Sequence, residues 1–281
     1  ALAPFWEFRG HIAEGRRRME EMLAAVQGSP GGRARALNAA GFLTMRAGDR
    51  RASLPLYRES LALRRALGDT QGVAGALNNM ANALLELGEY AQAEPAYAES
   101  LELCRAVGGQ WGVATAFNNQ SVAARELGQY ERAEALAQES LALRRAQGDP
   151  RGVAETTNNL AQVASAQGRH EQAAALFKEG LVLSKEVGDK LRVLEALEGL
   201  AWAAAALGQP RRAARLGAAA EAERERLGLP LGLPDRTARD RAILAMRAAL
   251  GEEAFAAAWA EGRDVMLSEA IALALTADPA G

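Results

Sequence analysis

The chain has 281 residues, of which 49% are hydrophobic, 24% charged and 5% aromatic; this is enough apolar material for a core and too little charge for a disordered chain. A formal net charge of −2 argues against direct nucleic-acid binding, which normally needs a basic face. The single Cys excludes an internal disulfide, the two His disfavour an all-protein zinc site, and no apolar run reaches the roughly 18 residues of a membrane span.

The N-terminal residues 1–32 read as a two-helix unit whose first helix lacks its first half. Phe5 and Trp6 would lie late in a first helix that ends at Gly10, and a second helix would cover residues 14–25. We therefore interpret this stretch as a partial repeat and the chain as a piece of a longer protein. Because no basic segment followed by an apolar stretch marks a signal peptide, we expect a cytoplasmic protein.

From residue 33 onward the chain repeats itself every 40 residues. The segment NNMANALLELGEYAQAEPAYAESLEL begins at Asn78, and similar segments begin at Asn118 and Asn158. Two series of glycines keep the same step: Gly48, Gly88, Gly128, Gly168 and Gly208, and Gly68, Gly108, Gly148, Gly188 and Gly228. A constant step of this length indicates a repeat protein. We divide it into five repeats, 33–72, 73–112, 113–152, 153–192 and 193–232.

Each repeat reads as two helices, which we call helix A and helix B. In the repeat at 73–112, apolar residues of helix A recur three and four positions apart, at Leu77, Met80, Ala81 and Leu84. Glycines end both helices, since glycine readily adopts a positive φ. Small residues recur where neighbouring helices must approach closely: Gly41, Ala81, Ser121, Ala161 and Ala201 in helix A, and Ala93, Ala133, Ala173 and Ala213 in helix B. One such pair buries too little surface to be stable, so we expect stacked pairs in an all-α solenoid.

The pattern fades after Gly228. Pro230 and Pro234 break the chain, and residues 236–250, 252–262 and 268–275 look like three further helices. Terminal units of solenoids are often atypical because they close the core against water. We therefore expect residues 233–281 to form a helical cap.

These residues resemble the tetratricopeptide repeat (TPR). The family pattern of a large residue, then Gly-x-Tyr, then Ala is present as Leu77, Gly88-Glu89-Tyr90 and Ala93. The 40-residue length and the Asn-Asn pair in helix A are similar to the kinesin-light-chain-like type. The resemblance covers at least residues 33–232. It implies a right-handed superhelix of about five full hairpins plus the partial N-terminal one, whose helix A residues line a concave groove.

The two ends extend this resemblance. FWEFRGHIAEGRRRMEEML and LGEEAFAAAWAEGRDVMLSEAIALAL look like segments that flank the TPR region of bacterial signal-transduction ATPases, the STAND regulators related to the maltose-regulon activator and LuxR-type regulators. In those proteins the TPR region acts as a sensor or interaction surface, and a DNA-binding or other output domain lies elsewhere in the chain. The resemblance implies the same role for this chain.

Sequence motifs of catalysis are missing. There is no phosphate-binding Gly-x-x-x-x-Gly-Lys-Ser/Thr, no His-Glu-x-x-His, no nucleophile elbow and no Cys-x-x-Cys. We expect a protein that is not an enzyme and needs no cofactor or metal. Nearly all basic residues are Arg, and we interpret pairs such as Arg64-Arg65 and Arg144-Arg145 as charges spread over the surfaces of helix B.

Polar residues recur on the face of helix A that would line the groove. An Asn amide offers two donors and an acceptor, so it can pair with a peptide backbone without reading its side chains. The candidate ligand-binding residues are Asn38, Asn78, Asn79, Asn82, Asn118, Asn119, Arg125, Asn158, Asn159 and Gln162. The alternative is that these amides bridge neighbouring helices and hold the spacing of the repeats.

The leading hypothesis is a sensor or interaction module that binds a peptide, a protein segment or a small effector. A chaperone-type carboxylate clamp is disfavoured, because Asn78 and Glu86 occupy positions where that clamp has basic residues. The second hypothesis is a passive scaffold that self-associates or packs on its own ATPase core. Its interface would be the apolar groove residues Phe42, Met45, Val122 and Trp202.

Overall fold

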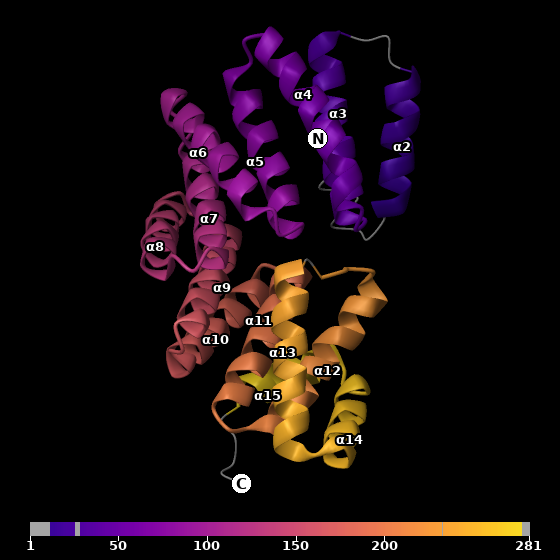
Figure 1. Ribbon diagram of the computed structural model, residues 1–281, viewed down its shortest axis with the longest axis vertical. Helices are drawn as coiled ribbons and strands as arrows, with labels where there is room; N and C mark the ends of the chain where they lie inside the picture. The colour runs from indigo at the N-terminus through magenta and orange to yellow at the C-terminus, as the bar shows by residue number, and fades with distance from the viewer. Residues whose placement is uncertain (1–11, 26–28, 232, 277–281) are drawn as a thin grey trace. The chain divides into compact units, whose positions relative to one another are not determined.

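The computed structural model describes residues 12–25, 29–231 and 233–276; Phe5, Trp6 and Gly10 lie outside them. Fourteen α-helices and no strand occur within these ranges (Figure 1), which confirms the all-α class. The helices are α2 (Ile12–Ala25), α3 (Pro30–Arg46), α4 (Arg50–Ala66), α5 (Thr70–Glu86), α6 (Tyr90–Ala106), α7 (Gln110–Glu126), α8 (Tyr130–Ala146), α9 (Pro150–Ala166), α10 (His170–Glu186), α11 (Lys190–Ala206), α12 (Pro210–Leu227), α13 (Leu233–Leu250), α14 (Glu252–Arg263) and α15 (Leu267–Leu275).

Short turns with recurring chemistry separate these helices. All ten glycines of the two series have positive φ, as expected. Several turns also provide an acidic N-cap: Asp69 Oδ1 and Asp149 Oδ1 each accept a hydrogen bond at 2.9 Å from a backbone N–H of the following helix. Helix ends and starts are therefore fixed by local residues, which keeps nine successive helices, α3 to α11, at 17 residues each.

Substitutions at Gly168 measure how much a glycine with positive φ contributes to the stability of a turn. The φ of Gly168 is +77°, and a methyl group on its Cα would meet no atom within 4 Å. Gly168→Ala is therefore expected to cost about 1–2 kcal/mol of unfolding free energy through backbone strain alone. Gly168→Asn should cost less, because Asn tolerates this region better. Urea unfolding of both variants tests this; an unchanged stability of the Ala variant would show that the turn relaxes.

The described residues cluster into two compact units, 1–127 with 228–233 and 128–227 with 234–281. The division falls at Leu127, inside the repeat 113–152, and not at a repeat boundary. In the first unit the core contains Tyr57, Tyr97, Leu77 and Leu84, all nearly fully buried. Small residues admit the large rings: a methyl group at Gly41 would lie 2.8 Å from the Tyr57 ring. This is the close approach that the small-residue pattern predicts.

The second unit uses the same device and adds the C-terminal helices. A methyl group at Gly199 would lie 2.2 Å from the ring of Phe177. The three helices expected after Gly228 are α13, α14 and α15. Met246 of α13 and Phe255 of α14 are buried against α12 in a cluster that Trp202 and Trp259 flank. Arg212 of α12 donates hydrogen bonds to the backbone oxygens of Leu273, Ala274 and Thr276 at the end of α15.

Candidate functional site

Asparagine side chains of successive A helices in the first unit form two sets of hydrogen bonds, one between Asn38 and Asn79 and one among Asn78, Asn119 and Asn118. Asn79 Nδ2 donates to Asn38 Oδ1 at 3.2 Å, which joins α5 to α3. Asn119 Nδ2 donates to Asn78 Oδ1 at 2.9 Å, which joins α7 to α5, and Asn118 Nδ2 donates to Asn119 Oδ1 at 3.2 Å. We call these five residues the amide ladder. Its amides link neighbouring repeats, so at least part of their hydrogen-bonding capacity is used inside the protein.

The rungs of the ladder differ in accessibility. Asn118 is only 1% exposed, whereas Asn38, Asn78 and Asn79 are half-buried. Asn82 is also half-buried, and its Oδ1 accepts a hydrogen bond at 2.6 Å from the Tyr97 hydroxyl. The Nδ2 groups of Asn78 and Asn82 donate to no group in the described part of the chain. These two amides therefore have donors available to a ligand.

The other candidate in this unit, Arg125, lies at the end of α7. Its guanidinium donates to Glu126 Oε1, with the Nη2 bond at 2.6 Å, and is largely buried. Glu126 also accepts a 3.3 Å hydrogen bond from the Tyr90 hydroxyl. Arg125 is thus charge-neutralised by its neighbour in sequence.

In the second unit the predicted amides are mostly covered. Asn158 is 1% and Asn159 9% exposed, while Gln162 is half-buried. Asn158 Nδ2 donates to the Arg192 backbone oxygen at 3.0 Å, which joins α9 to α11. Its Oδ1 occupies the space that a side chain at Gly180 would fill. Asn158 therefore acts in this structure as a bridge between helices.

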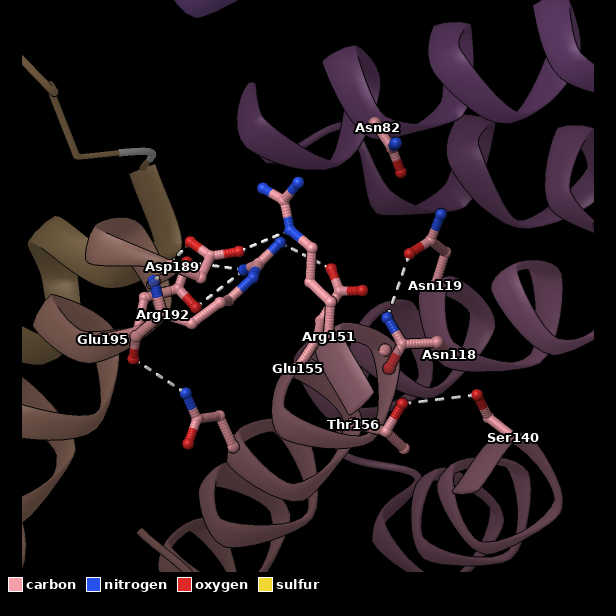
Figure 2. A network of polar contacts seen from close by, with 12 residues as sticks. Asn82, Asn118, Asn119, Ser140, Arg151, Glu155, Thr156, Asp189, Arg192 and Glu195 are labelled. Carbon is pink, nitrogen blue, oxygen red and sulfur yellow. Dashed lines mark hydrogen bonds and ion pairs between the residues drawn. The ribbon is translucent and has the colours of Figure 1, made fainter. Parts of the chain in front are cut away.

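A charged cluster joins α9 to its neighbouring helices, and Figure 2 labels its members Glu155, Arg192 and Glu195. Glu155 of α9 binds Arg144 of α8 through Oε2 at 2.8 Å and Arg192 of α11 through Oε1 at 2.5 Å. Arg192 also pairs with Glu195 at 2.7 Å. Burial raises the pKa of Glu155, but the charges of Arg192 and Arg144 outweigh this and lower it to about 2. The carboxylate is therefore ionised at any physiological pH.

A second buried ion pair joins α11 to α12. Arg224 Nε and Nη2 donate to the two oxygens of Glu198 at 2.5 and 2.9 Å. Both residues are less than a tenth exposed. Burial raises the pKa of Glu198, and the hydrogen bond and charge of Arg224 act in the opposite direction.

These arginines were not predicted as buried. The interpretation of Arg64-Arg65 and Arg144-Arg145 as surface charges is wrong for the first residue of each pair: the side chains of Arg64 and Arg144 are 12% and 4% exposed, against 53% and 58% for Arg65 and Arg145. Their signal in the sequence is an 80-residue step, since Arg64, Arg144 and Arg224 occupy the same position of every second repeat.

A polar cavity of about 220 Å³ opens beside the ladder in the first unit. It lies where α3, the end of α4 and the start of α5 meet. The residues that line it are Asn38, Arg64, Asp69, Gln71, Gly72, Gly75 and Ala76. Because two of them are glycines, backbone and not side chain forms part of the wall.

Two further features bear on the class of site. Within the described ranges, no group of three or more His, Cys, Asp or Glu is placed to hold a metal ion. None of the helices that the structure describes has the length and apolar character needed to cross a bilayer.

Comparison with known proteins gives the context. A model of the tetratricopeptide repeat family matches residues 72–146 and 152–222, more than half of the chain. No curated protein sequence matches. Similar solved structures include a Rap protein complexed with competence and sporulation factor (14% identity, 97% of this chain and 76% of that chain, TM-score 0.69) and NprR in complex with its cognate peptide NprX (16%, 96% and 74%, 0.59). Kinesin light chain repeats from Podosopora anserina are also similar (14%, 66% and 93%, 0.52).

Proposed function

The chain belongs to the tetratricopeptide repeat family, and from this we propose that it is a binding module that holds a peptide or protein segment and has no catalytic activity of its own. The similarity to the Rap protein and NprR, both solved with a bound factor or peptide, supports this proposal. A small effector is the other ligand class that the same surface could hold.

One observation carries the proposal. Asn78 and Asn82 lie one turn apart on α5, and each uses its Oδ1 within the protein while its Nδ2 remains available. Gly75, one turn earlier, is exposed and has no side chain to obstruct an approaching backbone. This face can therefore donate hydrogen bonds to alternate carbonyl groups of an extended peptide, which point to the same side of its chain. The other candidate residues would support this binding face. Asn118, Asn158 and Asn159 are buried and would do so through contacts within the protein.

The module is proposed to be the sensor or interaction part of a larger bacterial signal-transduction ATPase or transcriptional regulator, acting in the cytoplasm. The resemblance of both ends to segments that flank such regions supports this context. In this proposal residues 1–32 form a partial repeat, 33–232 the five repeats and 233–281 a cap. A ligand that prefers one arrangement of the repeats would shift its population and alter contacts with the adjacent domains.

The peptide proposal is tested with the double substitution Asn78→Asp and Asn82→Asp. Each Asp keeps the oxygen that accepts from Asn119 or Tyr97, so the fold should persist, but the two donors are lost. Peptides selected from a displayed random library should bind the variant at least about ten-fold more weakly than wild type, since each hydrogen bond is worth about 1 kcal/mol. Isothermal titration calorimetry measures this.

A matched control separates donor loss from added charge. Gln138→Glu, at an exposed position of α8, adds a carboxylate and should leave binding unchanged. Equal affinity of wild type and the Asp double variant, with an unchanged circular dichroism spectrum, would remove α5 from the binding surface.

The scaffold alternative rests on different residues from those expected. Met45 is 5% exposed and belongs to the core, and Phe42, Val122 and Trp202 are half-buried. Among the residues that the structure describes in the first unit, the exposed large apolar side chains are instead Leu67, Val107, Trp111 and Leu127, and Trp111 is 59% exposed. A concentration-dependent oligomer in light scattering that Trp111→Ser abolishes would favour this alternative.

A further inference from the structure

An arginine occupies the same position near the end of three B helices. Arg64 lies in α4, Arg144 in α8 and Arg224 in α12, at steps of 80 residues. The exposed fractions of their side chains are 12%, 4% and 8%. A guanidinium held in so little water requires partners that satisfy its charge and its donors.

The protein supplies a carboxylate to each of these arginines. Asp69, the N-cap of α5, pairs with Arg64 at 2.9 Å, whereas at Arg144 and Arg224 the carboxylate comes from within a neighbouring A helix. Arg144 Nη1 donates to Glu155, eleven residues later, at 2.8 Å. Arg224 donates to both oxygens of Glu198, 26 residues earlier. Carboxylates thus reach this guanidinium position from either neighbouring A helix.

Neither of the two positions that correspond to Glu155 and Glu198 holds a carboxylate near Arg64. The residue eleven positions later is Gly75, and the residue 26 positions earlier is Asn38. Both line the cavity of about 220 Å³ into which Arg64 also opens. A side chain on Gly75 would meet nothing within 4 Å. The volume that Glu155 fills in the second unit is therefore open at Arg64.

The available groups around this cavity are mainly donors. Arg64 Nε donates to Ser60 Oγ at 3.2 Å and Nη1 to Asp69 Oδ2 at 2.9 Å, and Nη2 donates to no group among the described residues. In the described part of the chain Asn38 uses only its Oδ1, as the acceptor for Asn79, so its Nδ2 is available as well. Gln71 lies at the exposed rim. Such a wall favours an acceptor that carries negative charge.

We propose that this cavity binds the carboxylate of a ligand, with Arg64 as its cationic partner and Asn38 as a second donor. The proposal deepens the peptide-binding function and rests on it for the nature of the ligand: the carboxylate would be an acidic side chain or the C terminus of a bound peptide. The site differs from the chaperone-type clamp, because its cation comes from helix B.

The affinity of this site depends on the nearby Asp69 carboxylate and on the number of cations available to the ligand. Asp69 places a negative charge beside Arg64, but the second unit has Asp149 at the same position and Arg144 still binds Glu155. Glu155 also has a second cation, Arg192, whose counterpart near Gly75 is Gly112. Arg64 therefore binds a carboxylate with one cation where Glu155 has two, and the affinity of a small probe is expected to be in the millimolar range.

The test uses three acetylated dipeptides that differ only in their carboxylates. Glycyl-glutamine amide has none, glycyl-glutamate amide has a side-chain carboxylate, and glycyl-glutamine with a free C terminus has a terminal one. The readout is the nuclear magnetic resonance signal of the Arg64 Nε–Hε group, assigned by its loss in Arg64→Gln. At least one acid should shift this signal with ten-fold or greater preference over the amide, and the two acids identify the source of the carboxylate.

Three variants of the intact chain complete the experiment. Gly75→Glu supplies an internal carboxylate like Glu155, so it should abolish probe binding and raise the melting temperature. Gly75→Gln fills the same space without charge and should give no comparable rise. Arg65→Gln, an exposed neighbour paired with Glu99 at 2.6 Å, should leave probe binding unchanged.

Equal binding of acids and amide, or acid-specific shifts of the Arg64 signal that persist in Gly75→Glu, would overturn the carboxylate site. That result leaves the peptide function standing if selected peptides still depend on Asn78 and Asn82. Conversely, acid-specific shifts at Arg64 together with peptides insensitive to those two residues would retain the site and remove the proposed peptide surface.

Discussion

Glu155→Gln is expected to lower the free energy of unfolding by about 3 kcal/mol. The substitution keeps the shape of the side chain but removes the negative charge that neutralises Arg144 and Arg192. Removing one partner of a buried ion pair leaves an uncompensated charge and typically costs about 3–5 kcal/mol. The lowering of the pKa from 4.5 to about 2 corresponds to a similar energy, about 3 kcal/mol. Urea unfolding followed by circular dichroism measures the change.

An exposed pair provides the control for this substitution. Glu179 lies 3.6 Å from Arg145, and both side chains are about half exposed. Because water screens such pairs, Glu179→Gln should change stability by less than about 1 kcal/mol. Similar effects of the two substitutions would mean that the cluster around Glu155 is hydrated in solution.

The stability of wild type and of Glu155→Gln should depend differently on pH. The pKa of Glu155 is lower in the folded state than the ordinary value of 4.5, so the stabilisation is fully present above about pH 5 and is lost as the pH falls toward 2. Wild type should therefore lose its advantage over Glu155→Gln across this window. A constant difference between the two proteins from pH 6 to pH 3 would contradict this assignment.

Gly262→Ala is expected to destabilise the packing of α14 on α12 by about 3 kcal/mol. A methyl group at residue 262 would lie 2.4 Å from the backbone oxygen of Arg215 and 2.8 Å from Cβ of Ala218. Backbone atoms cannot rotate away as a flexible side chain can, so α14 must shift and lose contacts. Urea unfolding gives the stability, and hydrogen exchange should show faster exchange in α14.

A second helical glycine distinguishes crowding from helix propensity. Gly75 has open space around its Cα, so Gly75→Ala should be neutral or stabilise by up to about 1 kcal/mol, because alanine is the better helix former. If Gly262→Ala behaved in the same way, α12 and α14 would be less tightly packed than this structure shows.

The fold was largely predictable from the sequence because its determinants are local. Glycines such as Gly88 and Gly168 end helices through their own backbone, and caps such as Asp69 begin them within three residues. Gly41, which admits Tyr57, lies at the small-residue position that recurs at the repeat step, whereas Gly199, which admits Phe177, lies outside that pattern. The boundary at Leu127 was not predicted, because it depends on contacts between helices and not on any one repeat.

The candidate site was less predictable, because helical spacing predicts which face of a helix a residue occupies but not which residue it contacts. Asn78 and Asn118 share a repeat position, yet one is half-buried and the other 1% exposed. Arg64 and Arg65 look alike in sequence, but only the first points to the neighbouring A helix and pairs with Asp69. Which amide contacts another amide, and which carboxylate an arginine binds, depends on residues 5 to 41 positions away.

The amide ladder also bears on how the protein is made. Each rung that joins two repeats spans 41 residues, as between Asn38 and Asn79 and between Asn78 and Asn119. A ribosome adding residues one by one therefore completes a rung as soon as the next A helix has emerged, without waiting for the C terminus. Nascent repeats can dock one after another onto those already folded. Translation pauses placed after an A helix would then coincide with units ready to dock.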